Sequence, residues 1–160
     1  EKGEFMYDEI YHIPLVIAHP ECEQPGSVND DFVYLHEAGI SALDIAGLDV
    51  PDEMDGHSLQ PAMLGRELPF QRDEVYCLFD RHFTIVNQRM VRTRTHQLTF
   101  NSFDKGELYD LVDDPYQLHN RYGDPEYDEV RRDLLDRMDR HMAELEDPVH
   151  RWFNRMKAVY

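Results

Sequence analysis

The side chains best suited to metal binding in this sequence are its 9 histidines and 33 acidic residues. Metal sites usually present such residues at fixed spacings, as in HExxH, paired His and Cys ligands, or a calcium-binding loop. None of these patterns occurs, and pairs such as His12 with His19, or His19 with Cys22, lack further ligands. Three carboxylates lie in the loop PDEMDG at 51–56, but turn formation explains the same composition. We therefore expect no metal to be bound by residues of this chain.

No nucleophile is marked by its sequence context. A serine nucleophile of the GxSxG type and a glycine-rich phosphate loop are both missing from the sequence. Cys22 and Cys77 lie far apart and outside any CxxC pattern, so we expect two free thiols and no disulfide framework. Residue types and spacing alone indicate an acidic α/β segment with no assigned reaction.

The charge of the chain excludes one class of partner. Its 33 acidic residues against 16 basic ones give a formal net charge of -17, whereas a nucleic-acid-binding protein needs a basic surface. Lysine occurs only at Lys2, Lys105 and Lys157, and a lysine-poor, acidic composition is typical of proteins that work in concentrated salt. An ordinary acidic protein is the alternative. The cytoplasm of a salt-adapted organism is the favoured compartment, and neither a membrane-spanning run nor a signal peptide is visible.

Hydrophobic patterning predicts an α/β organisation for the first half of the chain. The continuous apolar run IPLVIA at 13–18 is typical of a strand that is buried on both faces. A polar loop follows, and then a helix that Gly47 is suited to end in a left-handed conformation. Residues 49–73 are rich in Pro, Gly and Asp, which indicates a loop with one helical turn around 58–64.

The second half is predicted to form a small antiparallel sheet followed by helices. The β-like runs are 74–80, 89–101 and 107–112, with SFDKGE as a hairpin connection between the last two. From Pro125 onward the apolar period becomes helical, on a face that contains Val130, Leu134, Leu135, Met138, Met142 and Leu145. Asp147 and Pro148 predict the start of a last helix, which we expect to pack through Val149, Trp152, Phe153 and Met156.

Three stretches, in order, resemble the C-terminal part of sulfatases of the alkaline phosphatase superfamily. They are KGEFMYDEIYHIPLVI at 2–17, ISALDIAGLDVPDEMDGHSLQPAMLG at 40–65, and QRMVRTRTHQLTFN with GELYDLVDDPYQLHN within 88–120. The resemblance implies the C-terminal portion of an alkaline phosphatase-like α/β sandwich, with a small four-strand antiparallel sheet and C-terminal helices. It also implies a boundary, with 1–66 ending the catalytic α/β domain and 67–160 forming a C-terminal subdomain.

The same resemblance implies a calcium-requiring enzyme that hydrolyses a sulfate ester of a small molecule or carbohydrate. Such enzymes use a formylglycine made from the cysteine of a CxPxR motif, and neither Cys22 nor Cys77 has that context. The nucleophile and the calcium ligands are therefore expected in an N-terminal part that precedes this chain. We expect this segment alone to be inactive and to bind neither cofactor.

One catalytic residue is carried over from the family. Lys2 matches the lysine of the K-G-x-x-x-Y-[ED] stretch that contacts the sulfate group, where an ammonium stabilises the charge that develops on the oxygens. Arg81 and His82, which follow Asp80, lie where some relatives send a loop toward the substrate. Because an Arg-His pair suits an anionic ligand, these two residues are candidates for substrate binding, with a polar cluster at the end of the strand as the alternative.

The chain departs from the family pattern at a few positions. Glu37 and Ile40 replace an aspartate and a proline, and His96 and Gln97 replace a Tyr-Lys pair; both changes fall at positions that suggest a structural role. Two alternatives stay open: a phosphonate monoester or phosphodiester hydrolase of the same superfamily, and a non-catalytic remnant or binding module. The sequence does not determine the particular sulfate ester or the oligomeric state.

Overall fold

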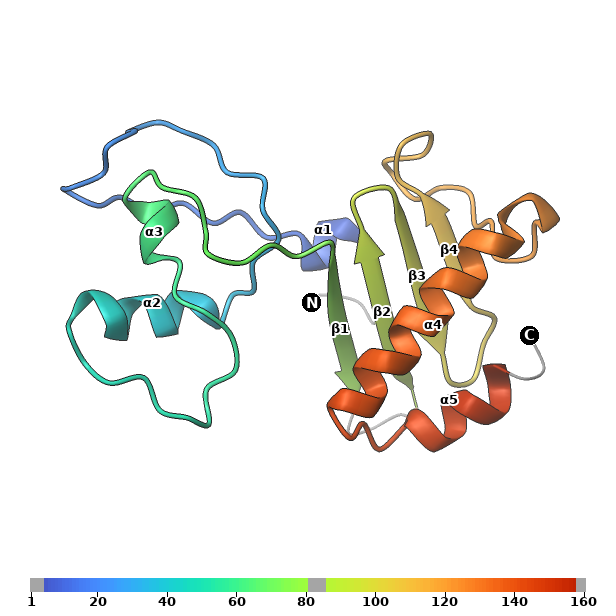
Figure 1. The fold of residues 1–160 in the computed structure, drawn as a ribbon. Coiled ribbons are helices and arrows are strands. Elements are labelled where there is room, and N and C mark those ends of the chain that lie inside the picture. Colours follow the sequence, from blue (N-terminus) through green and yellow to red (C-terminus); the bar gives the residue numbers. More distant parts are fainter. Residues whose placement is uncertain (1–4, 81–85, 158–160) are drawn as a thin grey trace. The chain divides into compact units, whose positions relative to one another are not determined.

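The computed structural model describes residues 5–80 and 86–157. The chain forms two compact units, one made of Glu1–Ile13 with Glu74–Tyr160 and the other of Pro14–Asp73 (Figure 1). We call the first the sheet unit and the second the loop unit. The boundary expected at residue 66 concerns the domains of a longer enzyme and stays a prediction. Within this chain, however, the first residues belong with the sheet that follows them by more than 60 positions.

The sheet unit is built on four antiparallel strands in sequence order, as Figure 1 shows. They are β1 (Glu74–Asp80), β2 (Asn87–Thr93), β3 (His96–Asn101) and β4 (Glu107–Asp110). The predicted small antiparallel sheet is thus confirmed. The run expected at 89–101 divides into two strands, because the Thr93 hydroxyl accepts the backbone N–H groups of Thr95 (3.3 Å) and His96 (3.0 Å) and closes a turn.

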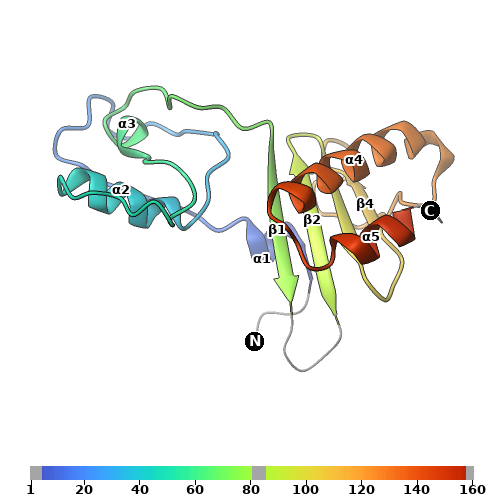
Figure 2. The same cartoon turned by 60° about the horizontal axis from the view of Figure 1, so that its bottom comes forward.

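The helices that follow the sheet cover one of its faces. A short 3₁₀ turn, η1 (Pro125–Tyr127), leads into α4 (Asp128–Glu144), and α5 (His150–Lys157) ends the described chain. Helix α4 lies across the sheet (Figures 1 and 2). The core consists of the apolar side chains that meet there: Tyr76, Val91, Leu98, Phe100, Leu108, Leu134, Leu135, Met138, Met142 and Phe153. Each large aliphatic side chain buried in this way contributes roughly 1.5–3 kcal/mol.

Two of the apolar residues predicted to pack are largely exposed. Leu145 is 54% exposed because α4 ends one residue before it. Trp152 is 42% exposed, and its indole N–H donates to the Ser102 carbonyl (3.3 Å) at the edge of the core. The remaining predicted contacts of α5 are confirmed, since Phe153 is fully buried with Val149 and Met156 packed beside it. Over residues 5–80 and 86–157, no helix has both the length and the apolar character needed to cross a membrane.

The loop unit contains two short helices, α2 (Glu37–Ile45) and α3 (Gln60–Met63). The predicted end of α2 is confirmed: Gly47 has φ +67°, and the Leu48 N–H donates to the Leu43 carbonyl (3.0 Å), which closes the last turn. Helix α3 occupies the helical turn expected around 58–64. Most of the remaining unit is irregular chain held by side-chain hydrogen bonds.

The strand expected at 13–18 is absent, so that prediction is wrong. Leu15 is 40% exposed, Val16 92% and Ile17 42%, and the segment has no regular structure. A strand buried on both faces needs partner strands on its edges. Within the described residues the strands are β1 to β4, which pair with one another, so this segment has no sheet to join. A continuous apolar run does not by itself specify its partners.

Candidate functional site

Lys2, Arg81 and His82 lie outside the described residues, but the structure describes the chain segments next to them. Lys2 is followed by residues 5–13, which include α1 (Asp8–Tyr11). Arg81 and His82 follow Asp80, the last residue of β1. Both flanking segments belong to the sheet unit, and both are held by buried or half-buried arginines.

Residues 5–8 are anchored on the face of the sheet opposite α4. Register pairs Arg92 of β2 with Gln97 of β3, so both side chains lie on that face, while the neighbouring Val91 points into the core. The Arg92 guanidinium donates two hydrogen bonds to Asp8, at 2.9 and 2.6 Å. The Gln97 amide donates to the Met6 carbonyl (2.7 Å). Since Met6 is only 2% exposed, this short segment is part of the packed structure.

A third element reaches the same segment from the loop after β4. The Gln117 side-chain carbonyl accepts the Asp8 backbone N–H (2.9 Å), which lies in the first turn of α1 and therefore has no acceptor within the helix. Gln117 has φ +55°, a left-handed conformation that costs a non-glycine residue about 1–2 kcal/mol. Tyr7 adds an edge contact with Tyr109, whose ring centroid lies 6.0 Å away. Contacts from β2, β3, β4 and this loop therefore converge on residues 6–8.

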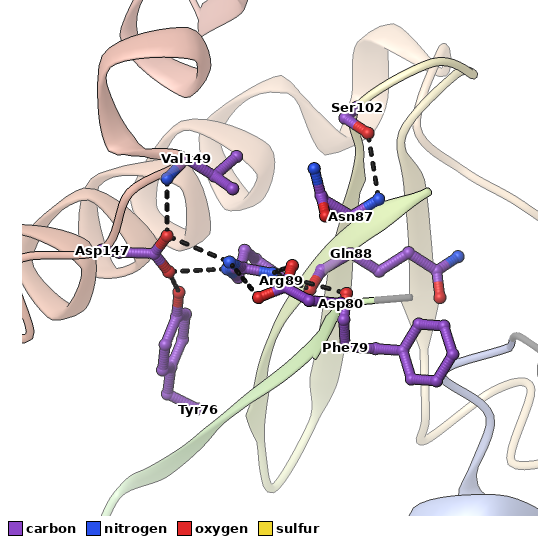
Figure 3. A network of polar contacts seen from close by, with 9 residues as sticks. All are labelled: Tyr76, Phe79, Asp80, Asn87, Gln88, Arg89, Ser102, Asp147 and Val149. Carbon is purple, nitrogen blue, oxygen red and sulfur yellow. Dashed lines mark hydrogen bonds and ion pairs between the residues drawn. The ribbon is translucent and has the colours of Figure 1, made fainter. Parts of the chain in front are cut away.

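The end of β1 is held by the network drawn in Figure 3. Arg89 of β2 is 1% exposed and donates to both Asp80 oxygens, at 2.8 and 3.1 Å. The same guanidinium donates to both oxygens of Asp147, at 2.6 and 3.0 Å. The Tyr76 hydroxyl (2.9 Å) and the Val149 N–H (2.8 Å) also donate to Asp147. One buried arginine thus connects the β1–β2 hairpin to the turn before α5.

The charge state of this network follows from its contacts. Burial opposes ionisation of Asp147, but hydrogen bonds from Arg89 and from the Val149 N–H outweigh it, and the pKa of Asp147 falls below its ordinary value. Burial and the adjacent Asp147 carboxylate raise the pKa of Tyr76, which keeps its hydroxyl protonated. The network therefore holds an ionised Arg-Asp pair at neutral pH. Its groups are fully occupied by one another, which makes it a support for the neighbouring chain and not a set of reactive groups.

The loop unit has its own buried carboxylate, Glu37. This residue is 0% exposed and receives hydrogen bonds from the Tyr34 N–H (2.8 Å), the His57 N–H (3.0 Å) and both terminal nitrogens of Arg72 (3.0 and 2.5 Å). Burial opposes ionisation, yet these hydrogen bonds lower the pKa of Glu37. All its acceptor positions serve the fold, so the departure from the sulfatase pattern at this position has a structural use.

The loop unit also contains an open cavity of about 470 Å³. It is lined mainly by the first part of the loop unit, including Leu15, Val16 and Ile17, and also by Met63 and Leu68. No predicted site residue contributes to this lining. The cavity is predominantly apolar, and its walls offer no concentration of cationic groups for a sulfate.

The described residues contain no candidate metal centre, and the Cys77 thiol is not activated as a nucleophile. No group of three or more His, Cys, Asp or Glu side chains within 5–80 and 86–157 could hold a metal ion. Both cysteines are free thiols, as expected. Burial raises the pKa of the Cys77 thiol to about 11, so it stays protonated and unreactive at neutral pH.

The residues that support the site were missed by sequence patterning. Arg89 with Asp147, and Arg92 with Asp8, are 58 and 84 positions apart, and no periodicity connects residues at such separations. Asp8 was part of the Lys-Gly to Tyr-Asp stretch but had no assigned role. Arg89 and Arg92 both lie in QRMVRT, one on each face of β2. This arrangement indicates that each arginine anchors a different segment, but only after the pairing of the strands is known.

Comparison with known sequences identifies relatives along most of the chain. Residues 2–144 match the family described as N-sulphoglucosamine sulphohydrolase, C-terminal. An uncharacterized protein of Haemophilus influenzae is 34% identical over 128 residues, which cover 80% of this chain and 66% of that protein. N-acetylglucosamine-6-O-sulfatase of Bacteroides thetaiotaomicron is 26% identical over 150 residues, covering 89% of this chain. The chain spans 27% of the length of that sulfatase.

Solved structures share the fold. A protein in complex with its substrate D-glucosamine-2-N,6-O-disulfate superposes with a TM-score of 0.58 at 24% identity, over 68% of this chain and 23% of the other. Phosphonate monoester hydrolase of Agrobacterium radiobacter superposes with a TM-score of 0.57 at 27% identity, over 65% of this chain and 23% of the other. The predicted fold class, a C-terminal part with a small antiparallel sheet and terminal helices, is confirmed.

Proposed function

Since this chain belongs to the N-sulphoglucosamine sulphohydrolase C-terminal family and is the C-terminal part of a sulfatase of the alkaline phosphatase superfamily, we propose that the full-length protein hydrolyses sulfate esters of carbohydrates. In this reaction water replaces the sugar oxygen on sulfur: the sulfur–oxygen ester bond breaks, and an alcohol and inorganic sulfate are released. The observation that carries the proposal is the match of residues 2–144, which begins at Lys2. Relatives named for sulfated sugars support a carbohydrate substrate.

Lys2 is the catalytic residue that this chain contributes to the proposed reaction. Its ammonium stabilises negative charge on the sulfate oxygens or protonates the leaving sugar oxygen. Removing one such donor commonly costs about 10² to 10³ in rate. Arg81 and His82 are the proposed contacts to the anionic substrate, next to Asp80, which Arg89 holds.

Calcium and formylglycine are proposed to be held by parts of the enzyme other than this chain. The described residues do not fit a calcium site, since they offer no cluster of three suitable ligands. Neither cysteine lies in a CxPxR context, so neither fits the formylglycine precursor. Both groups are proposed to reside in an N-terminal part of the full-length protein, which supplies the nucleophile.

The test is an assay of the full-length protein with two substrates. We expect sulfate release from N-acetylglucosamine 6-sulfate to exceed hydrolysis of a phenyl phosphonate monoester under the same conditions. The reverse preference would support the phosphonate hydrolase alternative, for which the Agrobacterium radiobacter enzyme is a superfamily relative. Turnover of neither substrate class, together with retained binding of the sulfated sugar, would support the binding-module alternative.

A matched pair of variants tests the role of Lys2. Lys2→Ala is expected to lower kcat for the sulfated substrate about 10² to 10³-fold. Lys105→Ala removes an exposed lysine from the β3–β4 connection and is expected to leave kcat unchanged. Equal activity of the two variants would remove Lys2 from the mechanism without affecting the family assignment.

A further inference from the structure

We propose that Arg92 is a positioning residue for sulfate-ester hydrolysis: it fixes the segment that carries Lys2 on the sheet. The inference rests on the proposed catalytic role of Lys2. Lys2 precedes Met6 by four residues, and an extended chain spans at most about 3.6 Å per residue. Fixing Met6 therefore confines the Lys2 backbone to within about 14 Å of it. Without that anchor, the backbone of the segment would be free to sample more conformations.

The Arg92–Asp8 contact has the geometry that such an anchor requires. Two parallel N–H to oxygen bonds of 2.9 and 2.6 Å fix both the distance and the relative orientation of the two groups. The side chains are only 19% and 23% exposed, so solvent competes weakly for these bonds. A lysine at position 92 would supply charge but not the two-pronged geometry.

Other contacts indicate that residues 6–8 are positioned specifically. Gln97 holds the Met6 carbonyl and Gln117 holds the Asp8 N–H, from two different parts of the sheet unit. Gln117 does so from a left-handed backbone conformation. Among the residues that the structure describes, the Gln97 carbonyl oxygen and the Gln117 amide nitrogen have no hydrogen-bond partner, although both residues are more than 90% buried. Each amide thus leaves one polar group unsatisfied while the other bonds the segment, which is unfavourable for stability alone.

Electrostatics is consistent with a positioning role and not with direct chemistry by Arg92. Its guanidinium is engaged by the Asp8 carboxylate and by the Thr93 carbonyl (3.1 Å). Arg92 therefore acts on the reaction through the segment that precedes it in the sequence by 84 positions.

The experiment is a double-mutant cycle in the full-length protein. Arg92→Met is made in the native protein and in the Lys2→Ala variant, and kcat, KM and the melting temperature are measured for each. Arg137→Met provides the matched control, because Arg137 also forms paired contacts, to Glu74 and Asp133 (both 2.7 Å), but on α4. Arg92→Lys replaces Arg92→Met if the latter does not fold.

We expect Arg92→Met to lower kcat about 10 to 100-fold in the native protein, since small misplacement of a catalytic group has costs of this order. In the Lys2→Ala background the same change is expected to alter kcat less than 3-fold, a coupling that a purely structural residue would not show. Arg137→Met is expected to lower the melting temperature without changing kcat in either background.

The outcomes separate the two proposals. If Lys2→Ala lowers kcat but the losses from Lys2→Ala and Arg92→Met multiply, or if Arg92→Met leaves kcat unchanged, the positioning role is wrong while the role of Lys2 stands. If Lys2→Ala has normal activity, the catalytic role of Lys2 is wrong, and Arg92 has no lysine to position.

Discussion

Arg89 and Asp147 are 58 residues apart in the sequence and joined by two hydrogen bonds of 2.6 and 3.0 Å in the sheet unit (Figure 3). Their side chains are only 1% and 2% exposed. The pair is stable in this setting because Tyr76, Val149 and Asp80 complete its hydrogen bonding. A buried pair of this kind is tolerated when both charges are satisfied, and becomes costly when one of them is left alone.

Removal of one partner is therefore expected to destabilise the protein strongly. Arg89→Met should lower the free energy of unfolding by about 3–5 kcal/mol, because it leaves the Asp147 carboxylate buried and unpaired. The double variant Arg89→Met/Asp147→Leu should lose less than the single variant. Denaturant unfolding of the full-length protein checks both. Arg66→Met is the control, since its pair with Glu23 is more than half exposed and is worth less than about 1 kcal/mol; a similar loss for Arg66→Met and Arg89→Met would contradict the prediction.

Stability should decline on acidification. The pKa values of Asp147 and Glu37 are lowered in the folded protein, so each carboxylate contributes stability above its unfolded pKa, near about 4, and loses it as the pH falls through the lowered folded value. The free energy of unfolding is expected to be level above about pH 5 and to fall below about pH 4. The difference in the free energy of unfolding between the native protein and the Asp147→Asn variant should become smaller in that acid range. If this difference stays constant down to about pH 2, ionisation of Asp147 does not contribute to the pH dependence of stability.

Gly56 is expected to be the glycine of the loop unit that is least tolerant of substitution. It has φ +112°, and a Cβ there would lie 2.9 Å from Glu37 Cγ, beside the buried carboxylate. Gly56→Ala should cost about 2 kcal/mol or more, through strain and displacement of Glu37. Gly47 also has a positive φ, but a Cβ there would meet no atom within 4 Å, so Gly47→Ala should lower the free energy of unfolding by only about 1 kcal/mol. Gly123→Ala, with nothing within 4 Å, should be nearly neutral, and thermal melts that reverse this order would contradict the prediction.

Arg81 and His82 are expected to act on substrate affinity. Arg81→Ala should raise KM for a sulfated sugar about 10-fold or more, because a charge-assisted hydrogen bond contributes about 1.5–3 kcal/mol. A smaller rise in KM is expected for His82→Ala, because an imidazole offers fewer hydrogen-bond donors than a guanidinium. Arg151→Ala, an exposed site on α5, is the control. An unchanged KM in both the Arg81 and the His82 variant would show that other residues bind the substrate.

The acidic composition predicts a response to salt. With a formal net charge of -17, self-repulsion destabilises the folded state at low ionic strength, and about 1 M salt shortens the screening length to roughly 3 Å. The melting temperature is therefore expected to rise between about 0.05 and 1 M KCl. Amide replacements at Asp52, Glu53 and Asp55 should make the rise shallower. A melting temperature that is independent of salt would favour an ordinary acidic protein.

Local patterns predicted the parts of the fold that local interactions determine. The spacing of Leu134, Met138 and Met142 predicted the buried face of α4, and Gly47 predicted the end of α2. The run 89–101 was correctly identified as β structure, but its turn depends on how Thr93 bonds its neighbours. The apolar run at 13–18 was misassigned because apolar character does not specify which strands, if any, lie beside it.

The sequence by itself determined the family, the acidic charge and the candidate roles of Lys2, Arg81 and His82, because these depend on residue identity and order. Only the tertiary structure decided that residues 5–13 pack with the sheet and that Arg92 and Arg89 hold the flanks of the candidate site. The physical reason is that an ion pair requires its two groups to meet in space. For residues 84 or 58 positions apart, strand pairing and core packing bring the groups together, and neither is encoded in any short stretch of the chain.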